Sequence, residues 1–421
     1  MKQKRKKGDD RPIFSRFGSL SFFEFVFCCL NSIIGTGALS LGYAFTSGLL
    51  FTNALNIIIA LISLYSLKLF VLSASYFHES TFEEIWTVAF SRSTVVFPAV
   101  CSIVSSISNI MKYLSFLQDS VVTILSTILK IIMDDPQDAI TEIEHYRFLI
   151  GFIIVFFFCV PTCFSSNLHY AVIISILSVS LFICIIIYII ARFIMMIEIN
   201  GFDPNNRLKL IDLNGHISGT ISSLAFSYLF YPFAWPGLRH SNNPSVNNLS
   251  KAFYATIFFS FILYTIFGTF SYLSFFDGNK GGIILDYYPD ETYTDKILLI
   301  IGHILTFVYI IFTIPIVLNS AKYVLLNTLH KKDDFSKDVW IPIGITATLI
   351  SLSLANLTGK TSEYIFIISD ILALLLLFFF PPIFYIKGFG TKNKLHFIGA
   401  ILELVIGIAA IAFIIYADCF D

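Results

Sequence analysis

Apolar stretches about as long as a bilayer is thick recur through the whole chain. Runs such as residues 148–160 and 171–190 are apolar on every helical face. A helix in lipid satisfies its own backbone, whereas a membrane β-barrel alternates apolar and polar residues in strands of about ten. The sequence therefore predicts an all-α polytopic membrane protein. Composition agrees, because 56% of the residues are hydrophobic and only 13% are charged.

These stretches predict about eleven transmembrane spans in one domain, residues 21–416. A basic arm, residues 1–20, precedes them and a short tail, residues 417–421, follows. The first stretch is too long for the core of a secretory signal, so we expect it to stay in the mature protein. The spans are expected at residues 21–45, 49–75, 94–129, 147–164, 168–193, 217–238, 252–276, 297–326, 339–357, 362–386 and 394–416.

Lys and Arg are concentrated in the segments that share a side of the membrane with the N-terminus. Cytosolic loops carry such an excess, so we expect a cytosolic N-terminus in an integral, multi-pass protein. No sorting signal stands out, which leaves the plasma membrane and a vacuolar or other endomembrane compartment both open. The lipid bilayer is the expected surrounding, the oligomeric state is expected to be a monomer, and no nucleic-acid footprint is evident.

Two of the expected spans are interrupted. The first carries Gly35-Thr36-Gly37 in its middle, and glycine costs about 1 kcal/mol relative to alanine inside a helix. The sixth carries Pro232 and Pro236, each of which removes a backbone donor. Spans one and six would open two halves of five, and matched interruptions of this kind mark the solute site in many transporters. The alternative is that the glycines only allow close packing and that Pro232 only bends its helix.

Unwound backbone at these positions suits a zwitterion. Helix N-terminal ends offer positive partial charge to a carboxylate, and free carbonyl oxygens can hold a cation or an ammonium group. We therefore expect a small solute to bind between spans one, three and six. The candidate residues of the two interruptions are Gly35, Thr36, Gly37, Ala38, Ser227, Tyr228 and Tyr231.

The third span carries polar residues on one helical face. Charges inside a span usually face a cavity or a partner, so Lys112 and Asp119 are functional candidates, and Asp370 in the tenth span is another. Each could instead be a buried structural partner for another helix. The face is formed by Ser105, Ser108, Lys112, Ser115, Asp119, Thr123 and Ser126.

Several motifs in this order resemble the amino acid/auxin permease family, including its sodium-coupled neutral amino acid transporters. The resemblance covers almost the whole chain. It rests on Asn31 with Gly35-Thr36-Gly37 and Tyr43-Ala44, Ser227-Tyr228 with Pro232, Thr313-Ile314-Pro315, and Pro381 with Phe384-Tyr385-Ile386-Lys387.

This resemblance implies the five-plus-five inverted-repeat fold of the bacterial leucine transporter with an eleventh helix added. It also implies alternating access, with amino acids as substrates and neutral ones expected. Asn31 and Thr313 match positions of a sodium site in the sodium-coupled branch, and Tyr113 matches an aromatic residue of the third span. The chain departs from that branch at Tyr231, where relatives have histidine, and at Asp370, where they have a small neutral residue.

These departures leave the coupling ion open. Neutral oxygens of Asn31 and Thr313 suit sodium, whereas a carboxylate such as Asp119 or Asp370 could carry a proton. No other cofactor is expected. The alternatives to transport are an amino-acid sensor on the same fold, an enzyme and a channel. The enzyme is disfavoured because no nucleophile and base lie at catalytic spacing and the eight histidines are scattered, mostly at span ends where we interpret them as interfacial.

Overall fold

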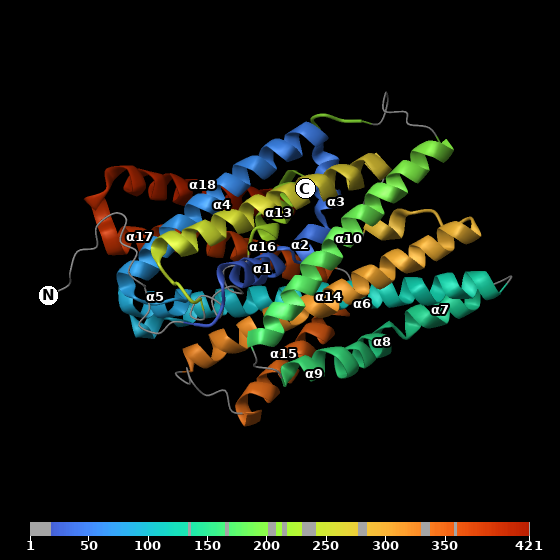
Figure 1. The fold of residues 1–421 in the computed structure, drawn as a ribbon, viewed down its shortest axis with the longest axis horizontal. Helices are drawn as coiled ribbons and strands as arrows, with labels where there is room; N and C mark the ends of the chain where they lie inside the picture. Colours follow the sequence, from blue (N-terminus) through green and yellow to red (C-terminus); the bar gives the residue numbers. More distant parts are fainter. Residues whose placement is uncertain are drawn as a thin grey trace.

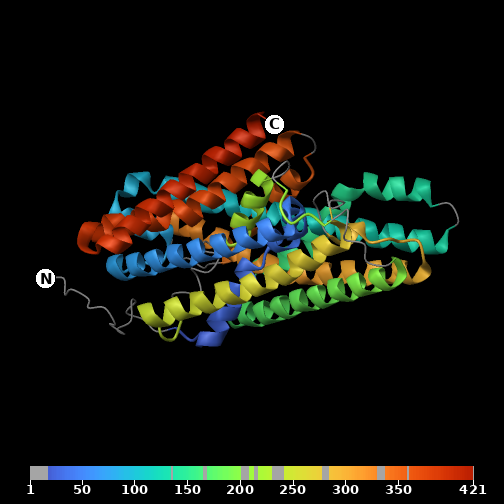
Figure 2. The same ribbon diagram turned by 90° about the horizontal axis from the view of Figure 1, so that it is seen from above.

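The computed structural model describes residues 18–133, 136–164, 168–200, 208–212, 217–229, 241–276, 284–329, 337–357 and 360–420. The described chain is built from helices, most of which run side by side along the long axis of the molecule (Figures 1 and 2). The long helices are α4 (Leu49–Phe77), α6 (Val96–Ile132), α10 (Leu168–Asn200), α13 (Val246–Phe275), α14 (Tyr293–Thr328), α15 (Lys337–Ala355) and α18 (Lys394–Phe420).

Eight helical stretches in the described residues are long and apolar enough to cross a membrane, which confirms a multi-pass all-α protein. The eighth combines most of α16 (Lys360–Leu374) with the π-helix η6 (Leu375–Phe379) and α17 (Phe380–Phe389). A ninth is added if α7 (Gln137–His145) is counted with the bent run of α8 (Arg147–Ile154), η3 (Val155–Cys159) and α9 (Val160–Cys163). The angle between those two parts is 57°.

The first expected span is broken where its glycines predict. α1 (Phe22–Ile33) ends before Ile34, and the chain resumes as α2 (Thr36–Leu39), α3 (Leu41–Ala44) and the 3-10 turn η1 (Phe45–Ser47). In the sixth expected span, α11 (Ile217–Ser227) ends ten residues before the chain reaches Gly237. Residues 230–240, which include Tyr231 and both prolines of that span, lie outside the described residues.

Local sequence explains where several helices begin. Ser21 caps α1, and Thr81 caps the short helix α5 (Phe82–Ala89). In each case the hydroxyl of the cap residue accepts a hydrogen bond from the backbone N–H of the glutamate three residues later. The carboxylate of that glutamate accepts a hydrogen bond from the backbone N–H of the cap residue. α5 is followed by the 3-10 turn η2 (Arg92–Thr94) and connects α4 to α6. These reciprocal hydrogen bonds, known as capping boxes, therefore fix the residues at which α1 and α5 begin, at one end of the bundle.

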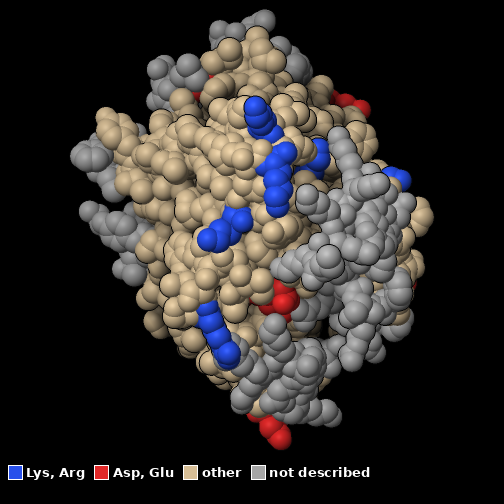
Figure 3. All heavy atoms as spheres, turned by 90° about the vertical axis from the view of Figure 1, so that its left-hand side faces the viewer, with Lys and Arg blue, Asp and Glu red and all other residues tan. Residues whose placement is uncertain are grey.

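The two ends of the bundle differ. The end at which α1 begins, called here the N-terminal end, holds α5 and the turn between α17 and α18 on the left of Figure 1. Lys and Arg side chains are spread over the part of this end that Figure 3 shows. The opposite end holds α7, the last turns of α10 and the 3-10 turn η5 (Ile284–Tyr287).

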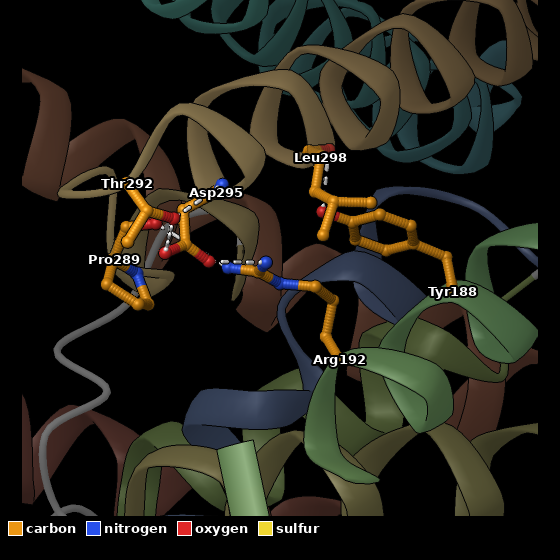
Figure 4. Close-up of polar contacts among 6 residues, drawn as sticks. All are labelled: Tyr188, Arg192, Pro289, Thr292, Asp295 and Leu298. Carbon is orange, nitrogen blue, oxygen red and sulfur yellow. Dashed lines mark hydrogen bonds and ion pairs between the residues drawn. The ribbon is translucent and has the colours of Figure 1, made fainter. Parts of the chain in front are cut away.

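A buried ion pair joins α10 to α14 at the opposite end (Figure 4). A guanidinium nitrogen of Arg192 lies 2.8 Å from a carboxylate oxygen of Asp295, and only 3% of the Arg192 side chain is exposed. Thr292 donates its hydroxyl to the same carboxylate at 2.5 Å. One turn away, Tyr188 donates its hydroxyl to the carbonyl oxygen of Leu298 at 2.8 Å. These bonds fix the first turn of α14 against α10.

We predict that Arg192→Leu lowers the thermal unfolding midpoint of the detergent-purified protein. Removing one member of a buried pair typically costs 3–5 kcal/mol, because the remaining charge loses its partner. The matched control is Lys209→Leu, whose pair with Asp212 lies nearer the surface, with 44% of the Lys209 side chain exposed, and should contribute about 1 kcal/mol or less. Equal midpoints for the two variants would contradict a structural role for Arg192.

Candidate functional site

One tyrosine connects the two interrupted helices. The hydroxyl oxygen of Tyr264, on α13, lies 2.5 Å from the carbonyl oxygen of Ile33 and 2.8 Å from that of Ser227. These residues end α1 and α11, where carbonyl groups lack their helical partners. A second buried tyrosine, Tyr309 on α14, donates its hydroxyl to the carbonyl oxygen of Ile34. Two tyrosines from different helices thus satisfy the backbone at the break.

The glycines of the first span allow close approach. A methyl group added at Gly37 would lie 2.6 Å from the hydroxyl oxygen of Ser227 and 2.8 Å from its Cα. One added at Gly35 would lie 2.8 Å from the hydroxyl oxygen of Tyr113. The structure therefore brings together Gly35, Gly37, Tyr113 and Ser227, which the sequence nominated from three spans.

The remaining residues nominated at the two breaks take different positions. Ala38 is fully buried beside Gly37. Tyr228 is also fully buried, but its hydroxyl donates to the side-chain oxygen of Asn56 on α4 at 2.7 Å. That bond holds α11 against α4 and occupies the hydroxyl. The side chain of Thr36 and the whole of Tyr231 lie outside the part of the chain that the structure describes.

Asn31 and Thr313 each form a hydrogen bond to a serine of α10. The side-chain amide of Asn31 donates to the hydroxyl of Ser175 at 3.5 Å, and the hydroxyl oxygens of Thr313 and Ser178 are 2.8 Å apart. Ser175 and Ser178 are one helical turn apart. The amide oxygen of Asn31 is buried and has no hydrogen-bond partner among the described residues. This cluster of neutral oxygens between α1, α10 and α14 is the kind of ligand set that a hard cation prefers.

Lys112 and Asp370 form an ion pair beside the break of α11. The ammonium nitrogen of Lys112, on α6, lies 3.6 Å from a carboxylate oxygen of Asp370, on α16. The same nitrogen lies 3.8 Å from the ring centroid of Phe226, the residue before Ser227. About one fifth of each charged side chain is exposed, at 19% for Lys112 and 18% for Asp370. The contacts of Lys112 therefore join α6, α11 and α16 next to the candidate site.

Asp119 lies further along α6 and has a different partner. Its carboxylate is 2.6 Å from a guanidinium nitrogen of Arg147, the first residue of α8. Arg147 also donates to the hydroxyl of Ser115 at 3.2 Å. Lys112 and Asp119 share a helical face as the sequence predicts, but each pairs with another helix. Asp119 and Asp370 thus belong to two different ion pairs.

Two residues that sequence reasoning did not nominate lie near Asp119. Burial, together with the charge of Asp119, raises the pKa of Asp286 in η5 to about 7. A carboxylate oxygen of Asp286 lies 3.3 Å from the Nε2 atom of His303, whose side chain is fully buried in α14. The interpretation of the histidines as interfacial is therefore wrong for His303. The position of His303 inside its expected span could have indicated that it is not at a span end. The proximity of Asp286 could not be predicted, because it depends on how a loop folds back.

We predict that Asp286→Asn flattens the pH dependence of thermal stability. With a folded-state pKa near 7, Asp286 keeps its proton where the unfolded chain, with a pKa of about 4, has released it. Its contribution to stability is therefore present at low pH and is lost as pH rises from about 4 to about 7. The unfolding midpoint should fall less from about pH 5 to about pH 8 in the variant than in wild type.

Asp138→Asn, at an exposed position of α7, is the matched control and should leave the wild-type slope unchanged. The groups that face Asp286 are Asp119, Arg147 and His303, and all three stay in place in both variants. Parallel slopes for wild type and Asp286→Asn would contradict the prediction.

The chain matches the sequence profile of a family described as transmembrane amino acid transporter protein over residues 18–418. This chain belongs to that family. The match confirms the resemblance stated from the motifs. A relative in Danio rerio, sodium-coupled neutral amino acid symporter 2, is 24% identical over 415 residues, which cover 93% of this chain and 80% of the relative.

Solved structures of other proteins share the helical fold of this chain. MhsT in complex with L-phenylalanine has a TM-score of 0.59 at 13% identity, covering 95% of this chain and 99% of that one. A manganese transporter mutant of Eremococcus coleocola has a TM-score of 0.56 at 10% identity, covering 98% of this chain and 92% of that one. The MHP1 transporter of the nucleobase-cation-symport-1 family has a TM-score of 0.55 at 11% identity, with 98% and 96% coverage. At these identities the likeness shows a shared fold.

Proposed function

We propose that this protein is a secondary transporter that moves a neutral amino acid across a membrane together with sodium. The observation that carries the proposal is the junction of two interrupted helices at Tyr264. Interrupted backbone at membrane depth persists only where protein or a polar cavity satisfies it. Family membership supports transport rather than enzymatic chemistry.

The substrate would lie between the breaks of α1 and α11. Amino acids carry a carboxylate and an ammonium group, and this region offers both kinds of partner. Backbone N–H groups near Gly35 and Gly37 would hold the carboxylate, while carbonyl oxygens such as those of Ile33 and Ser227 suit the ammonium group. Tyr264 has one O–H, which it can donate to only one of these two carbonyls at a time, so its hydroxyl would compete with an ammonium group for them.

A neutral substrate side chain fits the charges nearby. Lys112 and Asp370 offset one another, so the ion pair adds no net charge beside Phe226 and Ser227. A substrate with a charged side chain would have to disrupt that pair or be buried without a partner of its own. The name of the Danio rerio relative, a neutral amino acid symporter, agrees with this reading.

Sodium fits the cluster of Asn31 and Thr313 better than a proton does. Neither side chain titrates, and the unpartnered amide oxygen of Asn31 is an available ligand. The two carboxylates that could carry a proton, Asp119 and Asp370, each lie beside a cationic side chain. A proton carrier at either place would have to exchange that partner during transport. The same relative is sodium-coupled, which adds support.

The proposed architecture is two halves of five spans followed by α18 as an eleventh. In this arrangement α1–α3 and α11 with the segment after it are the opening spans of the two halves. The basic side chains at the N-terminal end support a cytosolic position for that end and for the arm of residues 1–20. We propose a monomeric transporter domain of residues 21–416 with a tail of residues 417–421, in the plasma membrane or an endomembrane.

We predict that wild-type protein in liposomes takes up neutral amino acids when an inward sodium gradient is imposed, and that Gly37→Ala abolishes this uptake. The added methyl group would collide with the backbone of Ser227, which cannot rotate away. A panel of labelled amino acids, run once with a sodium gradient and once with a pH gradient, measures substrate and coupling ion together.

The matched control for Gly37→Ala is Gly219→Ala on α11, where the nearest atom to an added methyl group is 3.4 Å away on the flexible ring of Tyr43. That variant should retain uptake. Uptake driven only by the pH gradient would show that the coupling ion is a proton and not sodium. Binding without uptake would show that the protein is a sensor. Undiminished uptake by Gly37→Ala would show that the break in the first span is not part of the substrate site.

We predict that Thr313→Ala raises the sodium concentration for half-maximal uptake by tenfold or more. Loss of one oxygen ligand of a small cation site costs about 1–3 kcal/mol, comparable to leaving a buried polar partner unpaired. Sodium titration of uptake measures the shift. Thr348→Ala is the control, because that buried hydroxyl only bonds carbonyl oxygens of its own helix, α15. An unchanged sodium response in Thr313→Ala would exclude this residue from the cation site.

A further inference from the structure

The turn between α17 and α18 is strongly basic. It contains the 3-10 turn η7 (Gly390–Lys392) and lies at the N-terminal end of the bundle, the end that faces the viewer in Figure 3. Lys387, Lys392 and Lys394 are all exposed, and together they are called here the basic turn. The sequence from residue 371 to residue 402 holds no aspartate or glutamate. The basic turn therefore presents three positive charges with no negative charge near them along the chain.

The lysines of the basic turn differ from other lysines at the ends of helices. Lys130 lies 2.5 Å from a carboxylate oxygen of Asp290, and Lys209 lies 2.6 Å from one of Asp212. In the part of the chain that the structure describes, no carboxylate lies within ion-pair distance of the basic turn. Its positive charge is therefore available to an anion from outside the chain.

Aromatic rings hold two of these lysines at the edge of the bundle. The ammonium nitrogen of Lys387 lies 5.3 Å from the ring centroid of Phe90, the residue after α5. That of Lys392 lies 5.4 Å from the ring centroid of Tyr76, near the end of α4. Both rings are partly exposed, at 40% for Phe90 and 37% for Tyr76. A ring attracts a cation without neutralising it, so these contacts orient the lysines and leave their charge in place.

An exposed apolar stripe on α18 begins directly beside the basic turn. Leu395 is 77% exposed, and Ile398, Leu402 and Val405 follow it with 56–57% exposed. Their spacings of three and four residues place them on one face of the helix. α18 is long and apolar enough to cross a membrane, so this face lies against lipid. Because that helix begins at Lys394, the basic turn lies where the hydrocarbon layer ends.

We infer that the basic turn and this apolar stripe together bind an anionic phospholipid. The lysine ammonium groups would hold the phosphate of its headgroup, and an acyl chain would lie along the stripe. A soluble anion would use only the charges, whereas a phospholipid is charged at one end and apolar along the rest, as this surface requires. Anionic lipids are concentrated in the cytosolic leaflet, which agrees with the proposed cytosolic position of this end.

A lipid bound there would hold three helices together at the N-terminal end. The rings of Tyr385 on α17 and His396 on α18 have centroids 5.9 Å apart, and Tyr76 on α4 lies 5.0 Å from the ring of Phe389 on α17. The headgroup would join the same helices through lysines that α17, η7 and α18 contribute. Binding should therefore increase the stability of the folded protein.

The test is thermal unfolding of the full-length protein in a non-ionic detergent, titrated with dioctanoylphosphatidylserine. We expect a saturable rise of the unfolding midpoint, as for any ligand that binds only the folded state. Dioctanoylphosphatidylcholine is the matched lipid control, since it has the same chains and no net charge and should give a much smaller rise. Sodium chloride at about 1 M should weaken the binding of phosphatidylserine, because the screening length falls to about 3 Å.

The triple variant Lys387→Gln, Lys392→Gln, Lys394→Gln should raise the phosphatidylserine concentration for half-maximal stabilisation about 100-fold. Each lysine near an anionic surface contributes about fivefold. All three side chains are exposed, so the lipid-free midpoint should stay near that of wild type. Replacing the same lysines by arginine keeps the charges and should keep the affinity. Lys251→Gln, at an exposed position near the start of α13 at the same end, is the matched control and should bind like wild type.

Four results would each overturn the inference. Equal stabilisation by phosphatidylcholine would show that the headgroup charge is not recognised. Equal stabilisation by glycerophosphoserine or inorganic phosphate, titrated separately, would show that a soluble anion occupies the basic turn. Wild-type affinity in the glutamine variant would place the lipid elsewhere, for example on the basic arm of residues 1–20, which that variant leaves unchanged. The fourth is the absence of any rise in wild type. None of these readouts depends on transport.

Discussion

The structure depends on how backbone carbonyl groups are satisfied where two helices stop inside the bundle. Ile33 and Ser227 end their helices inside the bundle, where an unpaired buried carbonyl costs several kcal/mol. Tyr264 reaches both from α13, and Tyr309 reaches Ile34 from α14. Because all of these contacts are buried, the interruptions are stable features rather than defects. A hydroxyl is also a partner that a polar ligand can replace.

The sequence predicted the parts of the site that depend on local chemistry. The glycine cluster at Gly35 and Gly37 indicated where the first helix stops, because glycine weakens a helix wherever it stands. The polar face of the third span was also readable from its spacing, and it correctly grouped Lys112 with Asp119. The family resemblance added Asn31 and Thr313, which the fold brings to one face of α10.

Pairings across the fold were beyond the sequence. Nothing in the local pattern says that Lys112 meets Asp370 or that Asp119 meets Arg147, since both carboxylates are compatible with either cation until the helices are packed. His303 was misread because helix ends were judged from hydropathy, which does not report burial by protein.

Two sets can be distinguished among the polar contacts between helices. One set ties α3 and α11 to each other and α11 to α4, through Thr220 with the carbonyl of Ala44 and through Tyr228 with Asn56. The other ties α6 to α8 and α15, through Gln118 with the carbonyl of Arg147 and through Ser351 with the carbonyl of Ile107.

Three contacts at the candidate site join other elements of the bundle. Lys112 on α6 lies against the ring of Phe226 on α11 and so joins the two sets, Tyr113 on α6 approaches Gly35 after α1, and Tyr309 on α14 donates to the carbonyl oxygen of Ile34. A ligand changes a conformational equilibrium only through contacts that differ between the two states. In the proposed transporter, a solute bound at the breaks would touch α11 of one set and α6 of the other, and a cation between Asn31 and Thr313 would touch α1 and α14. Occupancy of the site would therefore be coupled to movement of these helices against one another.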